Sequence, residues 1–397
     1  GILKIVLFLM FQARKPKNIF NFLKMFLVVL PALAFMIIAI LTLSDYGINW
    51  DEPYHFQRGQ AFLHYFLTGK RDFNDLPDYP YVSYECVDSE FGCDGPPGAP
   101  SDVKKFEGIY EIYEKTINSK MSSFATKRSS FQSDYYTFDY FTKNDFAGHP
   151  PANDVLAAFT NLVLYQKLGI LGDIESHHLF EVFAVFLLII GVSIFTYIEF
   201  GIFPSLVASA SLASYPLVFS ESHFNIKDPV EMSFYGLAII FFNFAFKKKN
   251  WKLLITSAIF AGLALGTKFN IVFMPFIVIP WLFVYYALQK RTSLQSPKIF
   301  KRSLVMLFVY SLLAIAIFYA FWPILWENPI EKIKLVLDFY WKNGTTVLPE
   351  VSQYILRGFN LFPITWILYT TPFPILVLSF IGFLVSLLKL VKDKKHI

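Results

Sequence analysis

The stretch from Phe22 to Leu43, FLKMFLVVLPALAFMIIAILTL, is long and apolar, and the polar run SDYGINWDEP follows it directly over 44–53. About 20 apolar residues in a helix are enough to cross the hydrocarbon core of a bilayer. A basic cluster that includes Lys24 marks the start of this stretch, and positive charge favours the cytoplasmic side. The stretch therefore predicts a spanning helix with a cytoplasmic N-terminus, and the polar run lies on the opposite face of the membrane.

The composition of the whole chain supports this interpretation. Of the 397 residues, 55% are hydrophobic, 19% are aromatic and only 16% are charged. A soluble domain usually carries about 25% charged residues. The proportions exclude a soluble enzyme, a disordered chain and a coiled coil, and they predict an all-α polytopic membrane protein.

Charge is distributed unevenly along the chain. Residues 45–150 contain 17 acidic and 10 basic residues, although the chain as a whole has a net charge of +5. Elsewhere the basic residues form short runs beside apolar stretches, a pattern typical of cytoplasmic loops. A nucleic-acid-binding protein would instead carry a basic stripe on a soluble face, so we predict no nucleic-acid partner.

Apolar length and flanking charge together predict eight transmembrane helices. The stretch Val155–Leu171 is short and is interrupted by polar residues, so we predict an amphipathic helix at the outer interface. With that helix outside, the basic clusters at 247–252, 290–302 and 389–395 all fall in the cytoplasm; counting it as a span would place all three outside. After Phe22–Leu43, the expected spans are Leu179–Tyr197, Pro204–Phe219, Val230–Phe246, Leu253–Leu265, Ile271–Leu288, Ser303–Phe321 and Pro372–Leu390.

We expect one membrane domain over 1–397, with outer segments at about 45–177, 220–229 and 322–371. Cys86 and Cys93 both fall in the first outer segment, where disulfides persist, and we predict that they form a bridge. The chain starts at Gly1 rather than at Met, so truncation is left open.

The first cluster of polar residues follows the first span directly. Asp51 and Glu52 are adjacent and lie among aromatic residues. Such a pair can supply a general base or hold a cation. The alternative is an interfacial aromatic belt followed by the solvated N-terminus of a helix.

Two further clusters fall on the same predicted side. Residues 221–229, ESHFNIKDP, contain His223, Asn225, Lys227 and Asp228 in one compact turn. The alternative for this turn is a hydrated loop whose lysine and aspartate pair with each other. Lys268 ends the run GLALGTK over 262–268. A cation at this position suits a phosphate. The alternative is a lysine whose side chain extends to the headgroups of the outer leaflet.

Two weaker features complete the set of candidate residues. His149 precedes Pro150 and Pro151 at the start of the interfacial helix, and Trp326 lies in FWPILWENP over 321–329. The alternative for His149 is a structural turn. The alternative for Trp326 is an aromatic anchor at the membrane interface. The sequence contains no GxxxxGK[ST], GxSxG or HExxH motif, so P-loop, serine-hydrolase and zincin chemistries receive no support.

The order of these pieces resembles the C-type (GT-C) glycosyltransferases. The pieces are an Asp-Glu pair after the first span, HPP, an acidic second outer loop, GxxxGTK and WPxxWxxP. In particular, they resemble the dolichyl-phosphate-mannose–protein mannosyltransferase and aminoarabinose-transferase branch, over about 22–390. The resemblance implies a GT-C-like helical bundle with a long first extracytoplasmic loop. It also implies transfer of a sugar from a polyprenyl-phosphate-linked donor in the membrane to a protein, lipid or glycan acceptor, on the extracytoplasmic face.

The resemblance also implies roles for single residues. Asp51, with Glu52 beside it, matches the acid that serves the acceptor, Asp228 matches the acid of the second outer loop, and Lys268 matches the lysine near the lipid phosphate. Many members carry an arginine at the start of the second span, but residues 175–179 here read ESHHL. Either Lys227, Arg58 or a histidine such as His178 is therefore expected to take its place, or the donor is held differently. The candidates on the acceptor side are His149, His223, Asn225 and Trp326.

Two questions stay open at this point: whether the protein needs a metal ion, and whether it is an enzyme. Some relatives in the wider superfamily require a divalent cation, for which Asp51, Glu52 and His223 are candidate ligands. The rival function is a transporter or a lipid-binding membrane protein without chemistry. A transporter is expected to place polar groups near the membrane midplane, whereas the polar residues here gather at one face, which favours an interfacial enzyme.

Overall fold

The structure is a computed structural model, and it describes residues 19–76, 128–143, 149–289, 297–345, 349–356 and 358–395. Most of these residues are helical, and the two short strands contain two residues each. The all-α prediction is therefore confirmed for this part of the chain. The predicted Cys86–Cys93 bridge and the glycine- and proline-rich run at 92–100 lie outside the described residues.

Contacts within the chain divide it into two compact units. The first unit comprises Gly1–Ile37, Ile189–Glu221 and Leu337–Ile397, and the second comprises Ile38–Leu188 and Ser222–Val336. Helices α2 (Ile19–Leu41), α7 (Asp173–Phe200) and α14 (Pro329–Thr345) each contribute to both units. The other elements of the first unit are α8 (Ile202–Ala213), α9 (Pro216–Glu221), α15 (Pro349–Ser352), β1 (Ile355–Leu356), β2 (Phe359–Asn360), α16 (Phe362–Thr370) and α17 (Phe373–Lys395).

The second unit contains the other described helices. Its elements before α7 are η1 (Leu43–Asp45), α3 (Glu52–Thr68), α5 (Phe138–Lys143), α6 (Ala152–Asn161) and the π-helical turn η2 (Leu162–Lys167). Those after α7 are α10 (Asp228–Lys248), α11 (Trp251–Leu265), η3 (Phe269–Phe273), α12 (Met274–Gln289), α13 (Pro297–Phe321) and η5 (Pro323–Trp326).

Four helices in the described part are long and apolar enough to cross a membrane. They are Leu23–Leu41, Asp173–Phe200, Asp228–Lys248 and Lys301–Phe321. A fifth candidate is the pair Phe362–Thr370 and Phe373–Lys389, whose axes are bent by 119°. The apolar helices Ile202–Ala213, Trp251–Leu265 and Ile271–Leu282 are shorter. These helices indicate an integral membrane protein, but the predicted number of eight spans is not confirmed.

The expected span Pro204–Phe219 is not one helix in the structure. Helix α8 ends at Ala213, and α9 begins at Pro216. Proline lacks the amide hydrogen that would continue the helical ladder, and it disfavours the helical conformation of the residue before it. Pro216 therefore explains why the apolar run breaks into two short helices.

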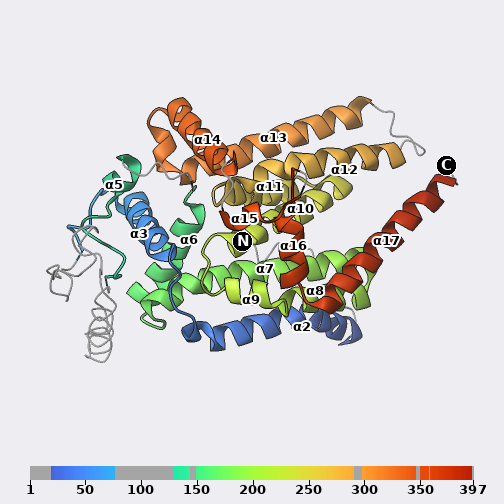
Figure 1. The fold of residues 1–397 in the computed structure, drawn as a ribbon, viewed down its shortest axis with the longest axis horizontal. Helices are drawn as coiled ribbons and strands as arrows, with labels where there is room; N and C mark the ends of the chain where they lie inside the picture. Colours follow the sequence, from blue (N-terminus) through green and yellow to red (C-terminus); the bar gives the residue numbers. More distant parts are fainter. Residues whose placement is uncertain are drawn as a thin grey trace. The chain divides into compact units, whose positions relative to one another are not determined.

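Within the second unit, helix α11 lies between α10 and α13 (Figure 1). The Ser257 hydroxyl on α11 donates to the carbonyl oxygen of Ala238 on α10, at 2.6 Å. On the other side, a Cβ atom at Gly262 would lie 2.7 Å from the carbonyl oxygen of Ala314 on α13. This close packing fixes the C-terminal end of α11, and with it the segment that carries Lys268.

Helices α3 and α6 approach each other even more closely. A Cβ atom at Gly59 would lie 2.2 Å from the carbonyl oxygen of Asp154, so only glycine permits this contact. The predicted interfacial segment thus packs one face against α3. Beside this contact lies an apolar core made by α3, α5, α6 and the chain after α3, with Ala61, Phe62, Leu63, Phe73, Phe138, Phe141, Val155 and Ala158.

Candidate active site

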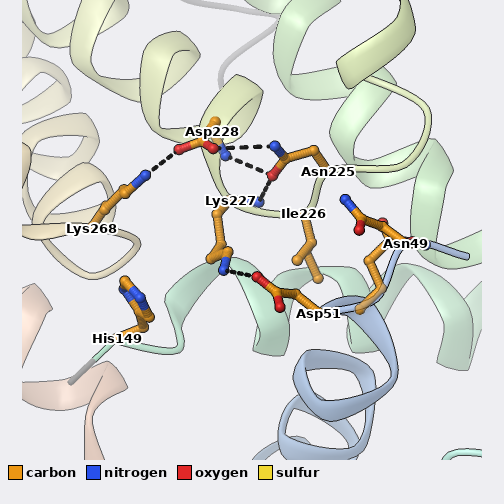
Figure 2. Close-up of a pocket in the computed structure, with 9 residues that line it drawn as sticks. Asn49, Asp51, His149, Asn225, Ile226, Lys227, Asp228 and Lys268 are labelled. Atoms are coloured by element: carbon orange, nitrogen blue, oxygen red, sulfur yellow. Dashed lines mark hydrogen bonds and ion pairs between the residues drawn. The ribbon is translucent and has the colours of Figure 1, made fainter. Parts of the chain in front are cut away.

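A pocket in the second unit gathers charged side chains from segments that are far apart in the sequence (Figure 2). It lies where the loop before α3, the turn before α10 and the segment after α11 meet, and a residue just before α6 completes it. The lining residues are Asn49, Asp51, Glu52, His149, Asn225, Ile226, Lys227, Asp228 and Lys268. All of them except Asn49 and Ile226 are residues that the sequence singled out. Their roles remain predictions, but the structure places them around one pocket.

Asp51 and Lys227 form an ion pair across the pocket. Lys227 Nζ donates to Asp51 Oδ2 at 2.8 Å. The side chain of Asp51 is 57% exposed, whereas that of Lys227 is only 13% exposed. The hydrogen bond from Lys227 lowers the pKa of Asp51, against the smaller opposing effect of partial burial. Asp51 is therefore an ionised carboxylate at neutral pH, and it is accessible from the pocket.

The turn before α10 is organised by the side chain of Asn225. Its Oδ1 accepts from the backbone N–H groups of Lys227 and Asp228 at 3.1 and 3.2 Å, and its Nδ2 donates to Asp228 Oδ2 at 3.1 Å. The first N–H groups of a helix have no partner inside the helix, and an asparagine just before it commonly satisfies them. Asn225 thus fixes the two charged residues that follow it.

Lys268 reaches the pocket from the end of α11. Its ammonium donates to Asp228 Oδ1, and the two side chains are 24% and 51% exposed. The carbonyl oxygen of Gly266 accepts from the Ala152 N–H at 2.7 Å, which ties the end of α11 to the start of α6. The pocket therefore carries two lysine–carboxylate pairs, each between residues on different segments.

A buried network under the pocket holds its backbone in place. Arg58 donates from Nε to Asp154 Oδ2 at 2.7 Å and from Nη1 to the carbonyl oxygen of His149 at 2.9 Å. Asn153 Nδ2 donates to Asp154 Oδ1 at 2.6 Å and to the carbonyl oxygen of Ile226 at 3.2 Å. Arg58 and Asp154 are 2% and 0% exposed. The network thus positions two lining residues, His149 and Ile226, through their carbonyl groups.

The charges in this network balance each other. Burial by itself would raise the pKa of Asp154, but Arg58 and His55 outweigh that effect and lower it. His55 Nδ1 lies 3.1 Å from Asp154 Oδ1, and burial lowers the pKa of His55 despite this carboxylate. The network therefore contains an arginine–aspartate ion pair beside a neutral imidazole. A buried pair of this kind is costly to break, because the remaining charge is left uncompensated.

His149 is a neutral imidazole in a positively charged surrounding. Burial lowers its pKa to about 4, and the charges of Lys227 and Arg58 add to the effect. At neutral pH its ring can donate one hydrogen bond and accept another. It can therefore contact a hydroxyl group without adding charge to the pocket.

Glu52 differs sharply from its neighbour Asp51. It is 1% exposed, and its Oε2 accepts from the backbone N–H of Asn49 at 2.7 Å. His178 Nε2 lies 3.2 Å from the same oxygen. Burial raises the pKa of Glu52, against the effect of His178. The two adjacent acids are therefore in different environments.

Four predicted site residues do not line the pocket. Arg58 and His178 are buried behind it, in contact with Asp154 and Glu52 respectively. His223 is fully buried, and its ring stacks on Tyr46 with a centroid distance of 4.4 Å.

The fourth of these residues is Trp326. Its indole N–H donates to the carbonyl oxygen of Tyr319 at 2.8 Å, and its ring lies 5.8 Å from that of Phe66. Arg58 was one of the alternatives for contact with the donor phosphate. In the structure its guanidinium is engaged with Asp154 and with the carbonyl oxygen of His149.

Sequence reasoning missed three residues that the structure places at or near the site. Asn49 lines the pocket, Asp154 anchors the network beneath it, and Glu181 lies beside Glu52 and His178. A signal for the two acids was present, because each stands inside an apolar stretch, in PPANDVLAAF over 150–159 and HHLFEVFAVF over 177–186. An ionisable residue within such a stretch marks a functional or structural site by default.

The fold and the pocket define a helical membrane protein with a charged site built from segments between its apolar helices. Residues 150–319 match the family model of the dolichyl-phosphate-mannose-protein mannosyltransferases, which are GT-C glycosyltransferases. The resemblance inferred from the motifs is thereby confirmed over these residues. Neither the curated proteins nor the solved structures contain a match to this chain.

The matched region includes one half of the pocket. Asn225, Lys227, Asp228 and Lys268 all fall within 150–319, whereas Asp51 and Glu52 precede it. The acid pair after the first span therefore contacts the matched region through the ion pair between Lys227 and Asp51.

Proposed function

We propose that this protein is a glycosyltransferase that moves a sugar from a polyprenyl-phosphate-linked donor to an acceptor hydroxyl at this pocket. The family match supports glycosyl transfer in general. The observation that carries the finer proposal is the presence of two lysine–carboxylate pairs in one pocket, Lys227 with Asp51 and Lys268 with Asp228. The reaction needs both kinds of group, and the pocket brings them together.

The two lysines suit the donor phosphate. A sugar linked to a lipid phosphate carries one negative charge, and that charge grows on the phosphate as the bond to the sugar breaks. Fixed cations stabilise such charge without reorganising during the reaction. Lys268 and Lys227 both line the pocket and reach it from separate segments (Figure 2). A phosphate between them would contact both.

Binding of the phosphate would also release the carboxylates. A phosphate oxygen competes with Asp51 for the ammonium of Lys227, because lysine binds phosphate as a point charge. The hydrogen bond from Lys227 is what lowers the pKa of Asp51. Its loss would raise that pKa and make Asp51 a stronger base. In this scheme donor binding activates the base.

The transfer step then has a simple balance. The oxygen of the acceptor hydroxyl attacks the anomeric carbon of the sugar, and the bond from that carbon to the phosphate oxygen breaks. The hydroxyl proton passes to the Asp51 carboxylate, and the lipid phosphate leaves with the bonding electron pair. His149, neutral and in the pocket, would orient a sugar hydroxyl. The acceptor is a protein hydroxyl, a lipid or a glycan, and the pocket is proposed to open on the extracytoplasmic face.

A transfer assay on the purified full chain in lipid nanodiscs tests the proposal. Polyprenyl-phosphate sugars labelled in the sugar would be supplied as a panel, and the release of lipid phosphate would be measured with and without candidate acceptors. We expect turnover with at least one donor, and loss of turnover in the variant Lys227→Met. In sealed proteoliposomes, movement of intact donor across the bilayer without release of lipid phosphate would instead support the transporter alternative.

A further inference from the structure

Beneath the pocket, three titratable side chains converge from two helices. Glu52 begins α3, and His178 and Glu181 lie on α7. Their exposed fractions are 1%, 0% and 0%. One potential ligand atom from each residue lies within 4.8 Å of those from the other two. His178 and Glu181 are three residues apart, so both side chains leave α7 on the same face.

Hydrogen bonds do not account for all the polar atoms of this triad. Glu52 Oε2 accepts from the backbone of Asn49 and lies 3.2 Å from His178 Nε2. Among the described residues, Glu52 Oε1 and His178 Nδ1 have no hydrogen-bond partner, although both atoms are buried. Buried polar atoms are nearly always satisfied, and a bound ion is one explanation for those that are not.

We propose that Glu52, His178 and Glu181 form a binding site for a divalent cation of the Mn²⁺ or Zn²⁺ type. Two carboxylates balance the charge of such an ion. Oxygen ligands combined with an imidazole nitrogen suit these metals better than Ca²⁺, which prefers oxygen ligands throughout. Bonds of about 2.1 Å to a common ion would require the three ligand atoms to move slightly closer together.

The site would have a role distinct from that of the lysines. A cation held by these residues would fix the first turn of α3 to α7, because its ligands come from both helices. The backbone N–H of Asn49 would support the bound ion indirectly, because it orients the carboxylate of Glu52. Asp51 precedes Glu52 directly, so the position of the proposed base would depend on the same turn. The ion would therefore act as a positioning element under the pocket.

The alternative is a triad that shares a proton and binds no metal. Burial raises the pKa of Glu52, and a protonated carboxyl could donate to a neighbouring acceptor. Of the two explanations, only the proposed site requires a cation. Metal binding measured in the absence of donor decides between them.

The experiment uses the full chain in nanodiscs, stripped with EDTA and then dialysed. Binding of MnCl₂ would be followed by the loss of the electron paramagnetic resonance signal of free Mn²⁺, and binding of ZnCl₂ by equilibrium dialysis and elemental analysis. We expect about one ion per chain and a higher melting temperature with the ion bound. Glu181→Gln and His178→Gln should each weaken binding at least tenfold. Glu175→Gln, on the same helix but outside the triad, is the matched control and should bind like the parent.

Failure to bind either ion stoichiometrically in the parent protein would overturn the proposal, as would unchanged binding in both ligand variants. If Glu181→Gln does not fold, His178→Gln and the metal-dependent melting temperature of the parent decide the result. The outcome is separable from that of the proposed function. A chain that binds Mn²⁺ but transfers no sugar contradicts only the function, and a chain that transfers sugar after stripping and binds no ion contradicts only the metal site.

Discussion

Lys227 Nζ lies 2.8 Å from Asp51 Oδ2, although 176 positions separate the two residues in the sequence. This contact joins the acid pair after the first span to the charged turn before α10. The alternative to a functional role for this turn was a hydrated loop in which Lys227 pairs with Asp228. In the structure Lys227 pairs with Asp51, and Asp228 pairs with Lys268. Each lysine thus meets an acid from a different segment, which makes the pocket a product of the tertiary fold.

The first prediction concerns Asp51 as the proposed general base. Asp51→Asn keeps the shape of the side chain and a hydrogen-bonding oxygen, but it removes the basic carboxylate. Loss of a general base typically lowers the rate by about 10²–10⁴-fold, and we expect a fall of that size in the turnover of the polyprenyl-phosphate-sugar assay. The protein should remain folded, because the Asp51 side chain is more than half exposed.

Asp45→Asn provides the matched control for this variant. Asp45 is an exposed acid that ends η1, six positions before Asp51, and it does not line the pocket. Its substitution should leave turnover near that of the parent. Parental turnover in folded Asp51→Asn would remove Asp51 from the mechanism.

The second prediction is that Lys268 contributes to donor binding. Lys268→Ala removes a cation from the pocket and leaves Asp228 without its ion-pair partner. A hydrogen bond to a charged group contributes about 1.5–3 kcal/mol, so we expect the Kd for the donor to rise by roughly 10- to 100-fold. Measurements with a non-transferable donor analogue in nanodiscs would separate binding from turnover.

Lys252→Ala tests whether any loss of charge on α11 has the same effect. Lys252 lies in the first turn of α11, whereas Lys268 follows the end of that helix. The control variant should bind donor like the parent protein. Equal Kd values for Lys268→Ala and the parent would transfer the phosphate-binding role to Lys227 alone.

Apolar periodicity and charge predicted the helical class, the positions of several long helices and seven of the pocket residues. They could not predict the break before Pro216, because local backbone chemistry opposes the apolar pattern there. Nor could they predict the partners of Arg58, whose role depends on a contact with Asp154, 96 positions further along the chain. Residue type predicts which groups can carry chemistry, whereas burial and pairing arise only when distant helices pack together.

The third prediction tests the packing of α3 against α6. Gly59→Ala would place a Cβ atom 2.2 Å from the carbonyl oxygen of Asp154, and the helices would have to separate. Overpacking of this kind typically costs about 1–3 kcal/mol. We expect a lower melting temperature in detergent. Gly47→Ala is the control, because a Cβ atom there would have no atom within 4 Å; equal melting temperatures for the two variants would refute this account of the contact.

The fourth prediction concerns membrane topology. We expect α3 and the pocket to lie outside the cytoplasm, and the basic cluster that begins in the last turn of α10 to lie inside it. Lys70, after α3, and Lys248, in the last turn of α10, are both exposed and suit labelling. In a background with Cys86 and Cys93 replaced by serine, Lys70→Cys should react with an impermeant maleimide in intact cells. Lys248→Cys should react only after permeabilisation, and the reverse pattern would invert the predicted topology.

The last prediction concerns pH and His149. Burial lowers the pKa of His149 to about 4, aided by Lys227, Arg58 and Lys268, whereas an unfolded histidine titrates near 6.5. Between these values the unfolded chain binds a proton that the folded chain does not, so His149 makes stability rise with pH across this window.

His149→Gln removes that linkage and keeps a side chain that can donate and accept hydrogen bonds. We therefore expect the melting temperature of the parent to fall more than that of the variant as the pH is lowered from 7 to 5. The other titratable groups are common to both proteins and largely cancel in the comparison. When turnover is plotted against pH, the profile of the parent should contain no step near pH 6.5 that is absent from the profile of His149→Gln. A step of that kind, or identical pH dependence of the two melting temperatures, would show that His149 is not held neutral by its surroundings.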